Sequence, residues 1–139
     1  KNNVVEKISY NNIFNSEKYV LFADDSSFIR RLVETLLEKL GLKSKIFENG
    51  EDLLFELKEL DPNDIGLIVT DLEMPIMDGN HLIKEINKLD KYSDINIIVH
   101  TNMSNFVLEH SLVEIGVDEV IGKINMEKLS QGILKYFKS

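Results

Sequence analysis

The sequence contains no cysteine among its 139 residues, which excludes disulfide bonds and thiol chemistry. It has no apolar run approaching the roughly 20 residues that a membrane-spanning helix needs. Residues 1–18 are rich in Asn and Lys and lack the apolar core of a secretory signal. These absences argue against membrane insertion and secretion, and they predict a cytoplasmic location.

Positive charge is also scarce, because 16 Lys and Arg residues face 24 Asp and Glu residues and leave a formal net charge of −8. A domain with this excess of acid is poorly suited to binding the phosphates of nucleic acid or an anionic membrane surface. The apolar fraction of 43% and the charged fraction of 29% are ordinary for a globular protein. We therefore expect one acidic globular domain that does not bind nucleic acid.

The start of the chain differs from the rest. It begins with Lys1 rather than Met, and residues 1–18 carry five asparagines with only scattered apolar residues. We interpret this segment as a linker or tail from an upstream domain, with a short extra helix docked on the domain as the alternative. The regular pattern begins at Tyr19, so the predicted domain comprises residues 19–139.

From there, apolar runs that suit strands alternate with helical patterns. The expected strands are Tyr19–Ala23, Lys45–Phe47, Ile65–Thr70, Ile95–Thr101 and Val117–Gly122. The expected apolar helix faces are Phe28, Ile29, Leu32, Val33, Leu36, Leu37 and Leu40; Leu53, Leu54 and Leu57; Leu82, Ile83, Ile86 and Leu89; a helix ending at Ile115; and Met126, Leu129, Ile133 and Phe137. Ser26 and Ser104 are expected N-caps, and Gly41 and Gly116 are expected helix stops. Strand and helix repeated five times predict a parallel sheet covered by helices on both faces.

The stretch from Leu67 to Gly79 is the most informative in the chain. Apolar and β-branched residues lead directly into Asp71, a Met-Pro turn follows, and Asp78-Gly79 opens a helical pattern. An unbroken apolar run of this kind is typical of a strand buried on both faces of a parallel sheet. Asp71 should then lie at the carboxyl edge, where open α/β sheets bind ligands, and we interpret it as the reactive residue.

Four of the five expected strands lead into residues that can do chemistry. The first ends in Asp24-Asp25, the third in Asp71 and the fourth in Thr101, and Lys123 follows the fifth. Because the carboxyl ends of parallel strands meet at one edge, we expect three carboxylates, a hydroxyl and an ammonium in one cleft. Simpler roles are also possible: a helix cap for the acidic pair, a loop acid, a plain strand threonine and a surface lysine.

Three neighbouring carboxylates repel one another, by roughly 4 kcal/mol for unit charges ~4 Å apart at an effective dielectric constant of about 20. Such a cluster suits a hard divalent cation, and Mg²⁺ fits a site with few carboxylates and several waters. An aspartate there can attack a phosphoryl group, and an ammonium and a hydroxyl can bind the phosphoryl oxygens. The residues therefore point to metal-dependent formation and loss of an aspartyl phosphate.

This constellation resembles the receiver domain of two-component response regulators (CheY-like), because five positions agree in identity, order and strand context over residues 19–138. The resemblance implies a flavodoxin-like, three-layer αβα fold with five helices and a five-stranded parallel sheet of order 2-1-3-4-5, the order that CheY exemplifies. It also implies a signalling domain rather than an enzyme. By resemblance, Asp71 accepts a phosphoryl group from a histidine kinase, Lys123 contacts the phosphate, and Thr101 moves to hydrogen-bond it.

The resemblance further implies a cofactor and an output surface. Mg²⁺ is expected on Asp25, Asp71 and the backbone carbonyl of Glu73, with Asp24 acting through water. Phosphorylation is expected to shift a two-state loop equilibrium and to change the surface formed by the fourth helix, the fifth strand and the fifth helix. A downstream or adaptor protein is the partner expected there.

Within the family, Leu72–Gly79 and the His100-Thr101 ending of the fourth strand look most like the receiver of CheV-type chemotaxis coupling proteins. Those proteins carry an adaptor domain upstream of the receiver. An adaptor domain would explain both the missing initial Met and the Asn-rich segment, so we expect a role in chemotaxis.

The chain departs from the family pattern at three places. Ile124 follows Lys123 where receivers usually have a proline, and we expect a trans bond there because a cis bond without proline costs about 2.5–4 kcal/mol. Val120 replaces an aromatic residue that turns inward on activation in many receivers. Asn102 is bulkier than the small residue often found after Thr101. Any switch is therefore expected to depend on Thr101 and on loop rearrangement.

These departures keep other functions open. The main alternative is a pseudo-receiver that acts as a constitutive protein-interaction domain. A Mg²⁺-dependent phosphohydrolase is disfavoured because such enzymes commonly have a second aspartate where this chain has Glu73, and a flavodoxin is disfavoured because no phosphate-binding loop follows the first strand. His81, His100 and His110 lack metal-ligand spacing, so we interpret them as structural or surface residues.

Overall fold

The computed structural model describes residues 14–102, 105–123 and 125–139. Within these residues one parallel sheet has the order β2-β1-β3-β4-β5, as predicted. Its strands are β1 (Tyr19–Ala23), β2 (Lys43–Phe47), β3 (Ile65–Thr70), β4 (Ile97–Thr101) and β5 (Glu119–Gly122). Five α-helices are labelled in the described part of the chain: α2 (Ser27–Leu40), α3 (Gly50–Glu59), α4 (Gly79–Asn87), α5 (Phe106–Glu114) and α6 (Met126–Tyr136).

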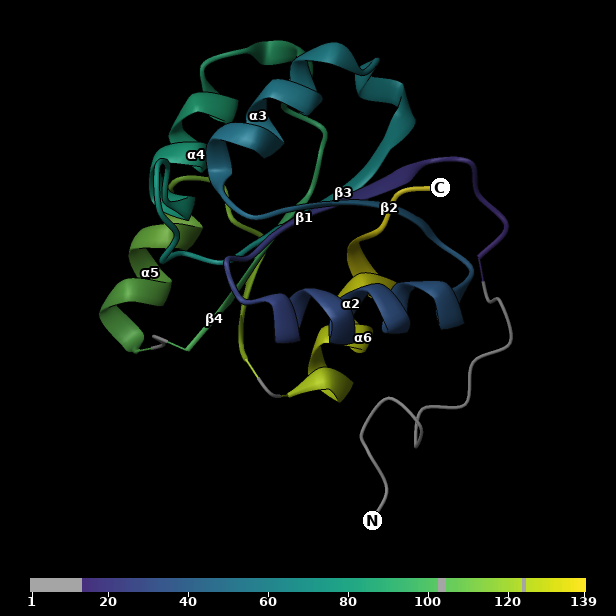
Figure 1. Ribbon diagram of the computed structural model, residues 1–139. Coiled ribbons are helices and arrows are strands. Elements are labelled where there is room, and N and C mark those ends of the chain that lie inside the picture. Colours follow the sequence, from purple (N-terminus) through teal and green to yellow (C-terminus); the bar gives the residue numbers. More distant parts are fainter. Residues whose placement is uncertain (1–13, 103–104, 124) are drawn as a thin grey trace.

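The helices form a layer on each side of the sheet (Figure 1). Helices α2 and α6 cover one face, and α3, α4 and α5 cover the other. Two buried apolar clusters fill the spaces between the sheet and these layers, and side chains of each strand alternate between them, so that Phe22 belongs to the first cluster and Leu21 to the second. The architecture is the predicted three-layer αβα fold. No described helix is both long and apolar enough to cross a membrane.

Strands β1 and β3 lie at the centre of the sheet, and every residue of β3 is buried. Their register places Ala23 beside Thr70. The next backbone bond continues this pairing, because the N–H of Asp71 donates to the carbonyl of Ala23 at 2.9 Å. The two central strands therefore deliver Asp24 and Asp71 side by side at the carboxyl edge, on the left in Figure 1.

The helix boundaries follow local chemistry. The hydroxyl of Ser26 accepts a hydrogen bond from the Ile29 N–H and caps α2, as predicted. Gly41 and Gly116 have φ values of 80° and 101° and follow helix ends in the left-handed conformation that glycine adopts without strain. The observed N-cap of α5 is Asn105, whereas the predicted cap, Ser104, lies outside the described residues.

The sequence prediction was wrong for two residues that it placed on buried helix faces. Phe28 is 70% exposed, because the buried stripe of α2 starts at Ile29 and Phe28 lies outside it. Leu89 is 42% exposed, because α4 ends at Asn87, before this leucine can join its apolar face. Strand bounds also shift: β2 begins two residues earlier than predicted, and β4 and β5 begin two residues later.

The described end of the N-terminal segment packs against the domain. The N–H of Phe14 donates to the Leu40 carbonyl at 3.0 Å, and the Phe14 ring meets the Phe137 ring edge-on at a centroid distance of 5.0 Å. Phe137 in turn fills the space beside Gly66, where an added Cβ would lie 2.2 Å from the ring. These contacts lie at the amino edge, so they leave the carboxyl edge of the sheet uncovered.

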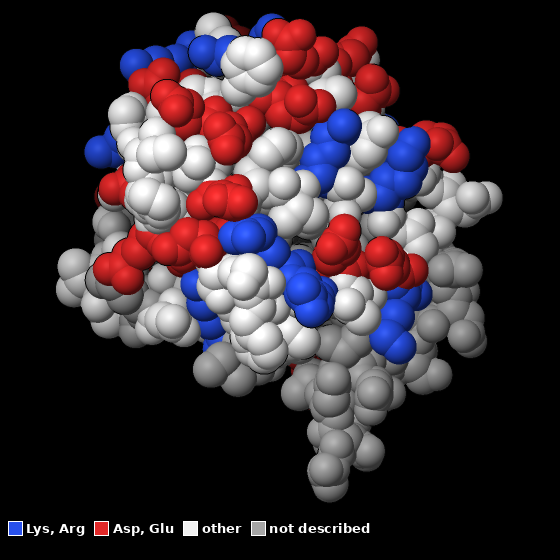
Figure 2. All heavy atoms as spheres, in the orientation of Figure 1, with Lys and Arg blue, Asp and Glu red and all other residues white. Residues whose placement is uncertain are grey.

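Charge is unevenly spread over the surface. Acidic side chains predominate in the upper half of the view in Figure 2, over α3 and α4, whereas both signs are mixed over α2. On the edge strand β2, the ammonium groups of Lys43 and Lys45 lie 4.8 and 4.9 Å from the centroid of the Tyr19 ring. Charged lysines on an edge strand oppose pairing with the strand of another molecule.

Candidate functional site

Three carboxylates meet at the carboxyl edge of the sheet, as the sequence predicts. One oxygen from each of Asp24, Asp25 and Asp71 lies within 4.8 Å of the others. Asp24 and Asp71 are buried, at 0% and 3% exposure, and Asp25 is exposed. The cluster thus has a buried floor and one acid that faces solvent.

The main chain and Lys123 together hold the carboxylate of Asp71. Its Oδ1 accepts the N–H of Leu72 at 2.7 Å, and its Oδ2 accepts the ammonium of Lys123 at 2.8 Å. The hydroxyl of Thr70 donates to the Asp71 carbonyl at 2.8 Å. The main chain therefore holds Oδ1 of Asp71, and Lys123, which also contacts Asp24, holds Oδ2.

Asp24 is held in a similar way. Its Oδ1 accepts the N–H of Ser26 at 2.9 Å, and its Oδ2 lies 3.0 Å from Lys123 Nζ. Burial raises the pKa of Asp24, because desolvation outweighs the Ser26 and Lys123 contacts that favour the charged form. Burial also disfavours the ammonium of Lys123, but hydrogen bonds to Asp71 and Asp24 outweigh it and raise the pKa of this lysine. One ammonium therefore bridges two buried carboxylates.

Strand pairing places Lys123 and Thr101 together. Gly122, the last residue of β5, pairs with Thr101 at the end of β4. The N–H of Lys123 then donates to the Thr101 carbonyl at 2.9 Å. Thr101 is 1% exposed. The structure thus brings together the ends of β1, β3, β4 and β5 that the sequence singled out.

Close backbone contacts at two glycines shape the loop after Asp71. The N–H of Gly79 donates to the Leu72 carbonyl at 2.8 Å, and a Cβ at Gly79 would lie 2.1 Å from the Asp71 carbonyl oxygen. The N–H of Gly50 donates to the Met77 carbonyl at 2.9 Å and ties this loop to the start of α3. The sequence showed Asp78-Gly79 as the start of a helical pattern, but it did not show the close approach of Gly79 to Asp71.

Sequence reasoning also missed Arg30. Its guanidinium Nη1 donates to the backbone carbonyl of Asp24 at 2.9 Å. An arginine on the first turns of a helix has no signature that would single it out, because the partner is a backbone atom and not a side chain.

The residues fit a magnesium ion. Two oxygens bound to one Mg²⁺ at about 2.1 Å can be no more than about 4.2 Å apart. The three carboxylate oxygens lie within 4.8 Å of one another, which is only about 0.6 Å beyond the span of two ligands on opposite sides of the ion. The donor set also matches, since Mg²⁺ prefers carboxylate oxygens and water. Glu73 lies two residues past Asp71 with its side chain exposed, and the role of its carbonyl as a ligand stays a prediction.

The departures from the family pattern are located as follows. Val120 is half-buried in β5 and pairs with Val99 of β4. Asn102 is exposed beside Thr101. Every described peptide bond is trans, but Ile124 lies outside the described residues, so the expectation of a trans bond there stays a prediction.

None of the three histidines belongs to the group of acids that could hold a metal ion. His81 and His110 are on helix surfaces, 3.6 and 3.3 Å from Glu85 and Glu114. His100 is fully buried in β4 beside the ring of Phe22, and neither ring nitrogen has a hydrogen-bond partner among the described residues. Burial, with a smaller contribution from the nearby Lys123 charge, lowers the pKa of His100 to about 4. We infer that it is neutral at physiological pH.

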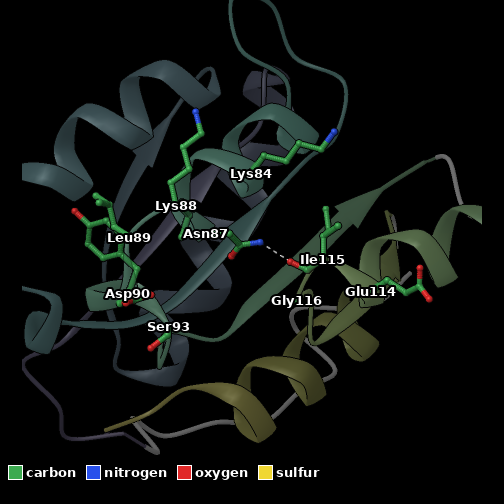
Figure 3. A pocket seen from close by; sticks show the side chains of 11 residues that line it. Lys84, Asn87, Lys88, Leu89, Asp90, Ser93, Glu114, Ile115 and Gly116 are labelled. Carbon is green, nitrogen blue, oxygen red and sulfur yellow. Dashed lines mark hydrogen bonds between the residues drawn. The ribbon is translucent and has the colours of Figure 1, made fainter.

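A separate hollow lies away from this chemistry. It has a volume of about 480 Å³ and lies between the ends of α4 and α5, next to the residues that lead into β4 and β5. Figure 3 shows Asn87 at its centre, where the side-chain amide donates to the Ile115 carbonyl at 2.5 Å. Because this hollow is at the amino edge, it is separated from Asp71 by the length of the sheet.

The parallel sheet and its acidic edge define an open α/β domain with three acids that could hold a metal ion near the ends of its central strands. Residues 20–133 match the response regulator receiver domain family, and the chain belongs to that family. Receiver domains are signalling domains of two-component systems rather than classical enzymes.

Chemotaxis proteins are among the relatives. Chemotaxis protein CheV1 of Helicobacter pylori is 36% identical over 139 residues, which cover 99% of this chain and 42% of that protein. The chain thus spans less than half the length of this curated relative. The response regulator TrrA of Thermotoga maritima, solved with Mg²⁺ and a beryllium fluoride, is 30% identical with a TM-score of 0.75, covering 86% of this chain and 99% of that one. CheY4 of Vibrio cholerae has a TM-score of 0.79 at 22% identity, covering 88% and 100%, and shows the same fold.

Proposed function

We propose that this domain accepts a phosphoryl group on Asp71 from a histidine kinase, with Mg²⁺ bound by Asp25, Asp71 and the Glu73 carbonyl and with Asp24 acting through water. The observation that carries this proposal is the position of the Asp71 carboxylate. Its Oδ2 lies 2.8 Å from Lys123 Nζ, and its carboxylate is within 4.8 Å of two further acids. A nucleophilic oxygen, a cation site and an ammonium for the incoming phosphoryl oxygens are thus side by side.

The reaction balances with these groups. A carboxylate oxygen of Asp71 attacks the phosphorus of a phosphohistidine, the P–N bond breaks, and its electron pair returns to the imidazole. The product is an acyl phosphate on Asp71. Mg²⁺, when bound, neutralises charge on the phosphoryl oxygens. Lys123, which contacts Asp71 Oδ2, is placed to bind an oxygen of the transferred phosphoryl group. The Leu72 N–H donates to Asp71 Oδ1 at 2.7 Å and keeps the carboxyl group oriented.

Treatment with acetyl phosphate and Mg²⁺, followed by intact-mass spectrometry, tests this proposal. We expect the wild type to gain one phosphoryl mass and Asp71→Asn to gain none, whereas the exposed-acid control Asp90→Asn should behave like the wild type. Lys123→Ala should form the adduct more slowly. A wild type that gains no mass, at a Mg²⁺ concentration that labels a known receiver, would contradict the proposal.

A pseudo-receiver that binds its partner constitutively is the second candidate. Val120, which has no aromatic ring to turn inward, favours this alternative because it removes one moving part of the switch. The two candidates differ in their response to beryllofluoride, which imitates the phosphoryl group. A change in partner affinity on adding beryllofluoride and Mg²⁺ supports the switching receiver, and an unchanged affinity supports the pseudo-receiver.

The output surface that we propose consists of α5, β5 and α6, which are the fourth helix, fifth strand and fifth helix of the sequence prediction. Its support is the composition of α5, on which Phe106, Val107 and Val113 are 83%, 76% and 55% exposed. The ring of Phe106 also stacks on His110, at a centroid distance of 6.3 Å and an interplanar angle of 18°. Exposed apolar side chains grouped on one helix indicate a protein-binding surface.

The wider setting is also proposed. We place the receiver domain at residues 19–139, with residues 1–18 leading in from an upstream adaptor domain, in a cytoplasmic chemotaxis protein. The similarity to chemotaxis protein CheV1, which is 36% identical over 99% of this chain, supports the chemotaxis role. The sequence that precedes Lys1 in the gene would test it directly: an adaptor domain there supports the proposal, and a different domain contradicts it.

A further inference from the structure

Arg30 connects two loops at the edge where the acids lie. It is on the second turn of α2, and its side chain is only 21% exposed. Nη1 donates to the carbonyl of Asp24 at 2.9 Å. Nη2 lies 3.9 Å from a carboxylate oxygen of Glu48, which follows β2. The guanidinium therefore reaches a backbone atom of the acidic pair and not its carboxylates.

The carbonyl that Arg30 binds belongs to the peptide bond between Asp24 and Asp25. Two other polar atoms of Asp24 have hydrogen-bond partners of their own: its N–H donates to the Phe47 carbonyl at 3.0 Å, and its Oδ1 accepts from the Ser26 N–H at 2.9 Å. Arg30 thus fixes the plane of the peptide group that links the buried acid to the exposed one. Because that plane sets the direction in which the chain leaves Asp24, it also sets where Asp25 stands.

We propose that Arg30 is a positioning residue for the cation site: it holds the Asp24–Asp25 peptide so that both carboxylates face Asp71. This role rests on the proposed function, because it concerns the binding of Mg²⁺ at the three acids. The chemistry of a guanidinium suits the task, since it stays charged and its planar fork can bond a carbonyl and a carboxylate at once.

The two contacts of Arg30 differ in weight. The bond to the Asp24 carbonyl is short and partly shielded, whereas Glu48 is 74% exposed and its ion pair is long. Exposed ion pairs at such distances contribute little. The positioning role therefore depends on the carbonyl contact, and Glu48 provides a control that disturbs only the other arm of the guanidinium.

The direction in which Mg²⁺ affinity changes when Arg30 is replaced separates positioning from simple electrostatics. A positive charge near a cation site repels the cation, so removing the charge of Arg30 should tighten Mg²⁺ binding if charge is all that it contributes. If Arg30 instead orients the acids, removing it should weaken Mg²⁺ binding. The two explanations therefore predict changes of opposite direction in the same dissociation constant.

Isothermal titration of Mg²⁺ into the wild type and three variants measures this constant. We expect Arg30→Met, which keeps the aliphatic stem, to weaken binding about tenfold, the lower end of what losing an outer partner costs a metal site. Arg30→Lys should recover part of the loss, because an ammonium can still donate to the carbonyl. Glu48→Gln should stay within about twofold of the wild type. Urea unfolding in EDTA checks that each variant is folded.

The outcomes are distinct. Weaker binding by Arg30→Met with partial recovery in Arg30→Lys supports the positioning role, and Arg30→Lys carries the test if Arg30→Met does not fold. Equal or tighter binding by a folded Arg30 variant overturns the role and leaves the proposed function intact. A wild type that binds no Mg²⁺ overturns the proposed function, and the role of Arg30 with it.

Discussion

Gly79 shows how one missing side chain shapes the site. Its backbone passes so close to Asp71 that a Cβ would lie 2.1 Å from the Asp71 carbonyl oxygen and 3.0 Å from Leu72 Cα. Both neighbours are backbone atoms, so they cannot move aside without shifting the loop that carries the phosphoacceptor candidate. The Asp78-Gly79 pair is therefore a steric requirement of the loop as well as a helix start.

We predict that Gly79→Ala lowers the free energy of unfolding by about 2–3 kcal/mol, as overpacking in a tight site does. Urea denaturation measures it. Gly122→Ala is the matched control, because a Cβ at Gly122 meets nothing within 4 Å, and its stability should change by no more than about 0.5–1 kcal/mol. Equal effects of the two substitutions would show that the close approach at Gly79 does not matter.

His100 makes stability depend on pH. Its folded-state pKa of about 4 is below the unfolded value of about 6.5, so between these values the unfolded chain binds more protons than the folded one. Stability from this group is therefore complete above about pH 6.5 and is lost as pH falls toward 4. We predict that the wild type loses about 2 kcal/mol more than His100→Phe between pH 7.5 and pH 5.

Urea unfolding of both proteins at the two pH values measures this difference. Asp24 acts in the opposite direction, because its pKa is raised in the folded state and its contribution to stability falls as pH rises above its unfolded value. Since Asp24 is present in both proteins, the comparison isolates the histidine. Parallel pH profiles for wild type and variant would contradict the prediction.

At the scale of elements, α4 and α5 differ in how many of their residues are buried. Each has nine residues, but α4 buries Gly79, Leu82, Ile83 and Ile86, whereas only Leu112 of α5 is buried. Apolar residues lie all round α5, and the exposed ones gain nothing from the domain's own core. Low burial favours local opening, which suits an element whose surface is proposed to change on phosphorylation.

Hydrogen–deuterium exchange tests this difference. We predict that amides of α5 exchange at least about tenfold faster than those of α4, which corresponds to roughly 1.4 kcal/mol less local stability. The comparison within one protein removes differences in pH and temperature. Equal protection of the two helices would show that the partly buried residues of α5 hold it as firmly as the four buried residues hold α4.

For the whole molecule, three crowded acids in a chain of net charge −8 couple folding to the cation. A ligand that binds only the folded state raises the free energy of unfolding by about 2.7 kcal/mol when its concentration is 100 times its dissociation constant. We predict that MgCl₂ at that concentration raises the free energy of unfolding, measured with urea, by this amount relative to NaCl of equal ionic strength. Most of this increase should be lost in Asp25→Asn. Because Asp25 is exposed, the variant should fold normally without metal, and a full gain in Asp25→Asn would contradict the assignment of Asp25 as a ligand.

The periodicity of the sequence was enough to predict a parallel sheet covered by helices on both faces, whereas the strand order came from the resemblance to receiver domains. Five apolar runs alternating with helical stripes allow little besides a parallel sheet between two helix layers, because each crossover must be right-handed and bury one helix face. That arrangement alone brings the ends of β1, β3, β4 and β5 to one edge. The errors fell at element boundaries, at Phe28 and Leu89, which lie just outside the buried residues of α2 and α4.

The sequence by itself therefore determined which chemistry-bearing residues share the carboxyl edge, since the parallel direction of the strands follows from the pattern. Only the tertiary structure decided their contacts: one lysine ammonium between the buried Asp24 and Asp71, a guanidinium on a backbone carbonyl, and a glycine against the Asp71 main chain. The reason is physical. Periodicity encodes the face on which a side chain lies, whereas a contact needs two atoms within about 3 Å, and that distance is set by loops whose closure the pattern does not encode.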